Sequence, residues 1–242
     1  MKKFSNVSKA TFAISLFIII VTFHSCQKDQ VSNTVPSQKL ESRSSKTGDG
    51  IVSSSSILLP DLTIDSARLK SSAVVKNAVF KTNDCALVEG CVGGTGKRKL
   101  LRFDVATPNI GTADLVLGDP SSSSLFLYSA CHRHYHFSGY AKYELLNSSD
   151  VTIITGRKQA FCLEDYAKYA TNAGPGKFTC SNQGITVGWQ DIYGSYLDCQ
   201  WLDITDLAPG NYKLRVSINP EATLLESNYA NNVAVVLIKV NK

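Results

Sequence analysis

Short runs in which apolar and polar residues alternate follow one another along the chain from about residue 57 onward. Alternation with a period of two, bounded by Gly, Pro, Asn or Asp, is typical of β-strands that bury one face. After an Ala-Pro-Gly turn, for example, Leu214, Val216 and Ile218 fall on one face together with Tyr212. The segments predicted to be strands are 62–69, 76–82, 99–107, 113–118, 131–136 with its flanks, 151–156, 184–189, 212–219 and 232–240.

No segment shows a long, capped run with a period of 3.6 residues. The pattern therefore predicts an all-β fold, a single β-sandwich domain over residues 57–242 with long loops. Between residues 156 and 196 the alternation becomes irregular, and polar and aromatic residues gather there. Long structured loops on a β-scaffold are where sites are usually built, so we expect part of the functional site in this region.

The first 25 residues differ in pattern from the rest. They begin with lysines and continue with an apolar run over 10–23, which is short for a membrane anchor and fits a signal peptide over 1–25. Cys26 follows and resembles the lipidated cysteine of bacterial lipoproteins; the alternative is an ordinary secretory signal with an unmodified cysteine. Residues 26–56 are rich in serine, which predicts a flexible tether. Under either interpretation the protein is exported. It is then anchored by a lipid at the outer membrane or cell surface, or else it is secreted.

The 242-residue chain is 43% hydrophobic and 19% charged, so it can bury a full core. Its net charge of +5 includes three lysines of the signal peptide, which leaves 22 basic against 20 acidic residues in the remainder. A balance of +2 gives no basis for nucleic acid or an anionic membrane as partner. The one membrane contact we expect is through the lipid anchor.

Three of the four histidines lie within the sequence Cys-His-Arg-His-Tyr-His at 131–136. On a strand, His132, His134 and His136 would share one face, and imidazoles on one face favour a transition metal. At ~3.3 Å per residue the outer Cα atoms lie ~13 Å apart. The strand must then twist or bulge, or the middle ring must bind through its nearer nitrogen. The alternatives are three histidines on a wet strand face, or two ligands and a bystander.

Apart from Cys26, the chain has six cysteines, an even number that in an exported protein implies up to three disulfides out of fifteen connectivities. They are Cys85, Cys91, Cys131, Cys162, Cys180 and Cys199.

Four motifs together resemble the catalytic domain of the lysyl oxidases, over about residues 59–240. They are the histidine triplet at 131–136, Gly-Arg-Lys-Gln-Ala-Phe-Cys-Leu-Glu-Asp at 156–165, the long stretch 188–220 and Glu-Ser-Asn-Tyr-Ala-Asn-Asn at 226–232. The resemblance implies a copper amine oxidase in which His132, His134 and His136 bind copper. It further implies that Lys158 couples to Tyr193 to form the self-derived cofactor lysine tyrosylquinone.

Such a quinone would condense with a primary amine, lose the α-proton of the substrate to a base, and release an aldehyde; oxygen then restores the quinone and yields hydrogen peroxide. Asp191 and Asp198 flank Tyr193 and are the candidate bases. Protein lysine, a polyamine or a small amine would all meet the same quinone, so the substrate stays open at this point. The alternatives are a non-catalytic metal-binding surface or adhesion module and, more weakly, a copper carrier. Neither needs Lys158 or Tyr193.

The resemblance also implies the disulfides Cys85–Cys91 and Cys131–Cys180. Because the family's usual partners of Cys162 and Cys199 are missing here, a Cys162–Cys199 bridge is predicted as the third.

Finally, the resemblance implies a possible calcium site, since calcium prefers oxygen ligands. Asn228 replaces the usual aspartate there, and a plain polar turn is an equal alternative. The residues of this site are Asp61, the carbonyl of Leu62, Glu226, Asn228, Asn231 and Asn232.

Overall fold

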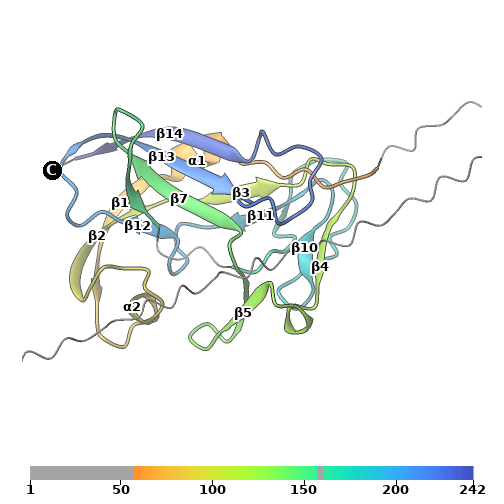
Figure 1. Ribbon diagram of the computed structural model, residues 1–242, viewed down its shortest axis with the longest axis horizontal. Helices are drawn as coiled ribbons and strands as arrows, with labels where there is room; N and C mark the ends of the chain where they lie inside the picture. Colours follow the sequence, from red (N-terminus) through yellow and green to blue (C-terminus); the bar gives the residue numbers. More distant parts are fainter. Residues whose placement is uncertain (1–56, 157–160, 242) are drawn as a thin grey trace, which may run out of the picture. The chain divides into compact units, whose positions relative to one another are not determined.

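The structure is a computed structural model that describes residues 57–156 and 161–241 (Figure 1). The predicted signal peptide, Cys26 with the tether to residue 56, and Lys158 lie outside the described residues. Within the described part of the chain, no helix is both long and apolar enough to cross a membrane.

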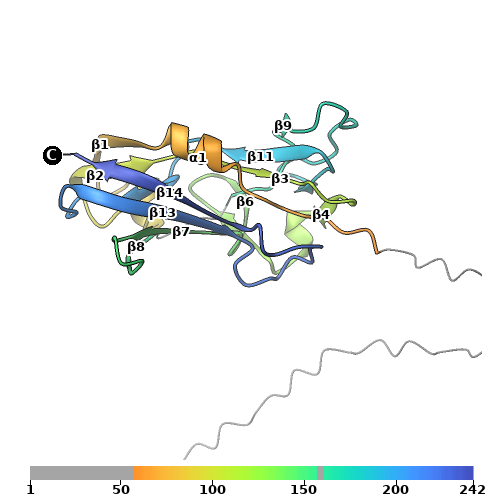
Figure 2. The same cartoon turned by 90° about the horizontal axis from the view of Figure 1, so that it is seen from above.

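The described residues form antiparallel sheets arranged as a β-sandwich, so the predicted all-β class is confirmed (Figures 1 and 2). One layer holds the order β14-β13-β7-β8, and the other holds β1-β2-β12 and β3-β11-β9. Two smaller pairs, β10-β4 and β5-β6, complete the strands. The first layer consists of β14 (Val233–Val240), β13 (Gly210–Ile218), β7 (Ala141–Leu146) and β8 (Thr152–Thr155).

The remaining strands are short, and they surround the loops that carry the site. Their bounds are β1 (Val74–Phe80), β2 (Gly96–Arg102), β12 (Trp201–Asp203), β3 (Val105–Pro108), β11 (Trp189–Tyr193), β9 (Ala167–Lys168), β4 (Leu115–Gly118), β10 (Gln183–Ile185), β5 (Phe126–Ser129) and β6 (His134–Phe137). The helical elements are α1 (Ser66–Ser72), α2 (Cys85–Val88) and the 3-10 turn η1 (Pro120–Ser122).

The alternation predicted for 212–219 appears in β13. Leu214, Val216 and Ile218 are fully buried, whereas the β14 residues Val235 and Leu237 face solvent. The buried face of β13 joins one hydrophobic core with residues of β7, β3, β11 and β12. Apolar area removed from water stabilises by roughly 25 cal/mol per Å², so these alternating faces fix which side of each strand turns inward.

The strand predicted for 62–69 is wrong, because Leu62 forms only an isolated bridge with Asn109 and the segment continues into α1. Asp65 caps this helix, because its carboxylate accepts a hydrogen bond from the Arg68 amide at 2.9 Å. Leu69 is fully buried, so the helix contributes one apolar side chain to the core. An aspartate followed by Ser-Ala-Arg-Leu is a capped helix start, a local signal that outweighed the apparent alternation.

All six cysteines form disulfides, but the three predicted pairings are wrong. The bonds are Cys85–Cys131, Cys91–Cys199 and Cys162–Cys180, with Cα atoms 5.7, 5.2 and 5.2 Å apart. The reason lies in α2, which separates Cys85 from Cys91 and directs them to different neighbours. Cys91 turns into a small core with Trp201 and Leu100, where Cys199 also lies. Cys85 meets Cys131, next to the histidines, so the segment that carries α2 is tied to the histidine hairpin at one end and to Cys199 at the other.

Candidate functional site

The histidine triplet lies on a hairpin, not on one continuous strand. His134 and His136 belong to β6, whereas His132 lies in the turn that connects β5 to β6. Arg133 adopts a left-handed φ of 60°, and its amide donates to the Ser129 carbonyl at 2.7 Å. The prediction that all three share one strand face is therefore wrong for His132. The turn shortens the distance that a straight strand would impose.

The hairpin brings the three imidazoles together. Their ring centroids are 5.9 Å apart for His132 and His134, 5.2 Å for His132 and His136, and 4.7 Å for His134 and His136. The Nε2 atoms of His134 and His136 lie 2.9 Å apart. Ring nitrogens about 2 Å from a common transition metal must lie within a few ångströms of each other, so this spacing suits a shared ion.

A further observation supports a metal at this position. The Nε2 atom of His132 is buried and has no hydrogen-bond partner among the described residues, while its Nδ1 atom lies 3.7 Å from Glu89 Oε2. A carboxylate beside one ring nitrogen holds an imidazole in the orientation that presents the other nitrogen to a metal. The residues present therefore fit a copper ion held by three imidazoles.

Glu89 is a site residue that sequence reasoning missed. It follows α2, and its side chain is only 9% exposed. Its Oε1 atom accepts a hydrogen bond from the Ser129 hydroxyl at 2.5 Å, and the Ser129 oxygen accepts one from the His132 amide at 3.2 Å. Glu89 thus contacts His132 through both the ring and, by way of Ser129, the backbone. No local sequence signal marks this glutamate, because its partners lie about 40 residues away.

Two mixed groups of cysteine and glutamate also place three potential ligand atoms close together. They are Glu89 with Cys91 and Cys199, and Glu164 with Cys162 and Cys180. In both groups the two sulfur atoms are bonded to each other, so neither offers a thiolate. Because the thiolate is the form of cysteine that binds metals, the histidines remain the metal site that the structure supports.

Tyr193 ends β11 and points its ring into the site. The side chain is 3% exposed, and its hydroxyl donates to the Cys162 carbonyl at 3.1 Å. Phe161 stacks on the Tyr193 ring with centroids 4.5 Å apart, and Phe161 also faces His136 at 6.2 Å. Burial, with Asp191 as a further cause, raises the pKa of Tyr193 well above its usual value of 10, so this phenol stays protonated at neutral pH.

Asp191 lies two residues before Tyr193 on the same strand, so both side chains face the same side of the sheet. Its side chain is 2% exposed, and burial raises its pKa from 3.8 to about 8. A carboxyl group with a pKa near neutrality can take up and release a proton at working pH. Asp198, the other candidate base, also lines the site.

These groups line one cavity of about 470 Å³. Three carboxyl groups lie on its wall, those of Glu164, Asp191 and Asp198, and no lysine or arginine is found among its described lining residues. The other residues on the wall are the three histidines, Phe161, Cys162, Tyr166, Cys180, Ile192, Tyr193, Tyr196 and Leu197. The cavity therefore combines aromatic surface with negative charge, which suits a cationic ligand.

The predicted calcium residues gather at a second place, with one exception. Glu226 is 3% exposed, and its Oε1 accepts hydrogen bonds from Asn219 at 2.6 Å and from Asn232 at 2.8 Å. Asn231 donates to Asp61 Oδ1 at 2.8 Å. At Leu62 the predicted ligand is the backbone carbonyl. In the structure it is the Leu62 amide that contacts this group of residues, and it donates to Glu226 Oε2 at 2.6 Å.

The buried Oδ1 atoms of Asn231 and Asn232 have no hydrogen-bond donor among the described residues. Buried oxygen atoms without a donor suit a hard cation, so the residues fit calcium. Asn228 does not join them. It is exposed, and its Oδ1 accepts from the Ala230 amide at 3.0 Å within a local turn.

Comparisons with known proteins agree with the geometry. The family model described as Lysyl oxidase matches residues 60–242. The human protein-lysine 6-oxidase is 37% identical over 189 residues, covering 72% of this chain and 44% of that protein. The Sus scrofa protein-lysine 6-oxidase is also 37% identical, with 72% of this chain and 74% of that protein covered.

The human lysyl oxidase homolog 1 is 37% identical over 186 residues, which are 72% of this chain and 32% of that protein. The chain thus spans less than half the length of both human relatives. Among solved structures, the CARDB domain of a Pyrococcus furiosus protein in complex with di-metal ions superposes with a TM-score of 0.31. It shares 14% identity and covers 76% of this chain and 90% of that one, a likeness too slight for any conclusion.

Proposed function

Because the chain belongs to the lysyl oxidase family, we propose that it is a copper-dependent amine oxidase acting on primary amines. The observation that carries the proposal is that three imidazoles, the buried phenol of Tyr193 and the buried carboxyl group of Asp191 line one cavity. The net reaction converts an amine, dioxygen and water into an aldehyde, ammonia and hydrogen peroxide.

His132, His134 and His136 would hold the copper ion, and Glu89 would keep His132 oriented. When bound, copper supplies the redox chemistry with dioxygen that oxidises a nearby phenol. The protein contributes a dry, aromatic setting for that phenol, since Phe161 covers one ring face of Tyr193 and the Cys162 carbonyl fixes its hydroxyl.

We assign Lys158 and Tyr193 as the source of a lysine tyrosylquinone. Lys158 lies outside the described residues, but the sequence places it three residues before Phe161, whose ring stacks on Tyr193. Phe161 is in turn held by β6, because the Phe137 amide donates to its carbonyl at 3.0 Å. Phe161, the first described residue after this segment, is thus anchored where the phenol lies.

Asp191 is the group we assign to accept the α-proton of the substrate. Its carboxyl group faces the cavity from the same strand as Tyr193, and its raised pKa lets it hold that proton at neutral pH. Glu164 and Asp198 add negative charge, which favours the approach of an ammonium group.

A visible absorption spectrum of the copper-loaded, air-matured protein tests the proposed function. We expect a quinone band that shifts on reaction with phenylhydrazine, in wild type but not in Tyr193→Phe, which keeps the buried ring and lacks the hydroxyl. A second aromatic residue of the wall, Tyr166→Phe, is the matched control and should retain the band. A colourless wild type with verified copper content would reject the quinone and favour a metal-binding module.

The second site leads to a prediction about stability. If Asp61, Glu226, Asn231 and Asn232 hold calcium, calcium at 100 times its Kd should add about 2.7 kcal/mol to the free energy of unfolding. Thermal unfolding of the copper-free protein in calcium and in chelator measures this difference. Magnesium serves as the control, because it prefers a smaller, strictly octahedral site. Equal melting temperatures in calcium and chelator would contradict the assignment.

Export, with a lipid on Cys26, is part of the proposal. Three disulfides in the described domain support an oxidising compartment. Intact-mass measurement of the mature protein from a membrane fraction tests the lipid, and an unmodified mature N-terminus would exclude it.

A further inference from the structure

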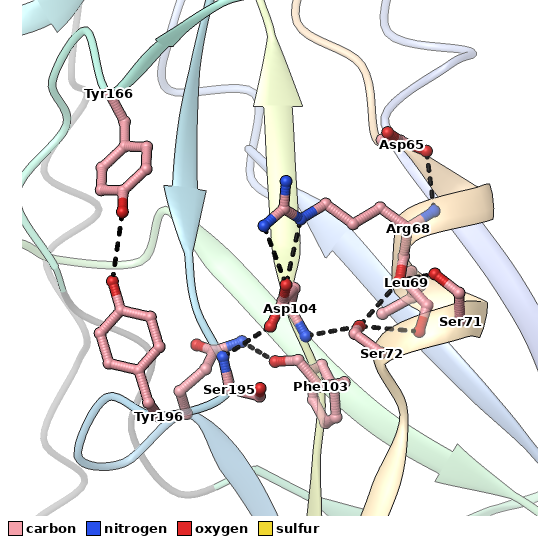
Figure 3. Close-up of polar contacts among 11 residues, drawn as sticks. Asp65, Arg68, Leu69, Ser71, Ser72, Phe103, Asp104, Tyr166, Ser195 and Tyr196 are labelled. Carbon is pink, nitrogen blue, oxygen red and sulfur yellow. Dashed lines mark hydrogen bonds and ion pairs between the residues drawn. The ribbon is translucent and has the colours of Figure 1, made fainter.

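Two exposed tyrosines meet at the rim of the cavity. Tyr166 and Tyr196 are 53% and 69% exposed, and both belong to the cavity wall, whose deeper residues Tyr193 and Asp191 are almost fully buried. The two hydroxyl oxygens lie 3.4 Å apart, a contact that joins residues 30 positions apart in sequence (Figure 3). The pair thus lies on the solvent-exposed part of the wall of the cavity that holds Tyr193.

The Tyr196 side of the pair is fixed by the residues next to it. The Ser195 amide donates to Asp104 Oδ1 at 2.7 Å, and Asp104 is paired with Arg68 at 3.0 Å (Figure 3). The Tyr196 ring lies against Gly194, where a Cβ atom would overlap it. Because Gly194 has no Cβ atom, the Tyr196 ring can pack against the backbone next to Tyr193.

The Tyr166 side is fixed as well. The preceding residue, Asp165, accepts hydrogen bonds from the Thr186 amide at 2.8 Å and the Thr186 hydroxyl at 2.6 Å, and another from the Lys177 amide at 2.6 Å. The Tyr166 amide donates to the Gln190 carbonyl of β11 at 3.1 Å. Both rings thus project from anchored backbone, and their hydroxyl groups contact each other.

We propose that Tyr166 and Tyr196 determine which amines enter, and that they select a primary ammonium group at the end of a slender, unbranched chain over lysine on a folded protein surface. This inference rests on the proposed amine oxidase function. A slender chain displaces only the contact between two exposed hydroxyls, and the ring faces can then pack on its ammonium group. A folded surface would have to displace both rings, which project from anchored backbone.

The chemistry of the wall agrees with this assignment. The carboxyl groups of Glu164 and Asp198 accompany the two rings, and the described wall residues include no competing cationic side chain. A single terminal ammonium group finds negative charge and aromatic surface together, as cation-binding sites commonly provide.

The test compares kcat/KM for n-butylamine with that for the surface lysines of ubiquitin, per quinone titrated with phenylhydrazine. We expect wild type to prefer butylamine at least about tenfold. Tyr196→Ala should reduce this ratio about tenfold, and Tyr166→Phe, which keeps the ring and loses the hydroxyl contact, should reduce it a few-fold. The control is Tyr169→Ala, an exposed tyrosine of the same loop outside the cavity wall, and it should leave the ratio unchanged.

A second measurement does not need the quinone. Calorimetric titration of the copper-free protein with butylammonium should show binding that Tyr196→Ala weakens several-fold and Tyr169→Ala preserves. Absence of any phenylhydrazine colour would reject the proposed function, whereas this binding result would still decide the role of the pair. Butylammonium binding that is equal in wild type and Tyr196→Ala would overturn the inference, as would an unchanged selectivity ratio.

Discussion

Replacing Asp191 by asparagine is expected to lower kcat/KM for a primary amine by about 10²–10⁴-fold, the usual contribution of a positioned general base. Asparagine keeps the shape of the buried side chain but cannot accept the α-proton. Because Asp191 lies two residues from Tyr193, the rate must be expressed per quinone titrated with phenylhydrazine. Steady-state peroxide formation measures it.

The pKa of Asp191 also predicts the direction in which kcat/KM changes with pH. With a pKa of about 8, the Asp191 carboxyl group is largely protonated at neutral pH and becomes a base as the pH rises. We expect kcat/KM of the wild type to increase through about pH 8 and then to level off. Asp198→Asn, which removes a carboxylate from the same cavity, is the matched control and should preserve this profile. A larger loss in Asp198→Asn than in Asp191→Asn would reverse the assignment.

The same shift predicts a change in stability of the copper-free protein. Between pH 3.8, the ordinary pKa of an aspartate, and about 8, the carboxyl group is protonated in the folded state and ionised in the unfolded chain. The folded state then binds more protons, so the free energy of unfolding falls as the pH rises across this window. Asp191→Asn should flatten this part of the profile, which denaturant unfolding at several pH values would record.

Replacing Glu89 by glutamine is expected to weaken copper binding about 10–100-fold, the usual effect of removing a carboxylate that orients a metal-bound histidine. Glu89 lies 3.7 Å from the His132 ring and accepts a hydrogen bond from Ser129, which holds the His132 amide. The neutral amide cannot support the ring with negative charge. Competition with a chromophoric chelator measures the affinity.

Glu164→Gln separates this effect from the loss of charge alone. Glu164 lines the same cavity, but among the described residues it forms no hydrogen bond or ion pair with the histidines, so its removal should change copper affinity much less. An electron paramagnetic resonance spectrum of the bound copper offers a second comparison, because it should change in Glu89→Gln and stay close to wild type in Glu164→Gln. Equal losses of affinity in the two variants would show that Glu89 acts through charge alone.

The sequence by itself determined much of this protein. Period-two alternation identified most strands, among them β13 and β14, because a strand with one buried face must alternate whatever its neighbours are. The motifs identified the family, and a histidine triplet in a chain almost without other histidines indicated the candidate metal centre. These are local features, carried by residues close together along the chain.

Only the tertiary structure decided what depends on contacts between distant segments. It placed His132 in a turn, paired Cys85 with Cys131 and Cys91 with Cys199, and brought Glu89 to the histidines and Tyr166 to Tyr196. Residue types and spacing do not encode such pairings, because many connectivities satisfy the same cysteines and any carboxylate could lie beside a histidine. The packing of the sandwich fixes where each loop ends, and it thereby selects one disulfide connectivity and one carboxylate.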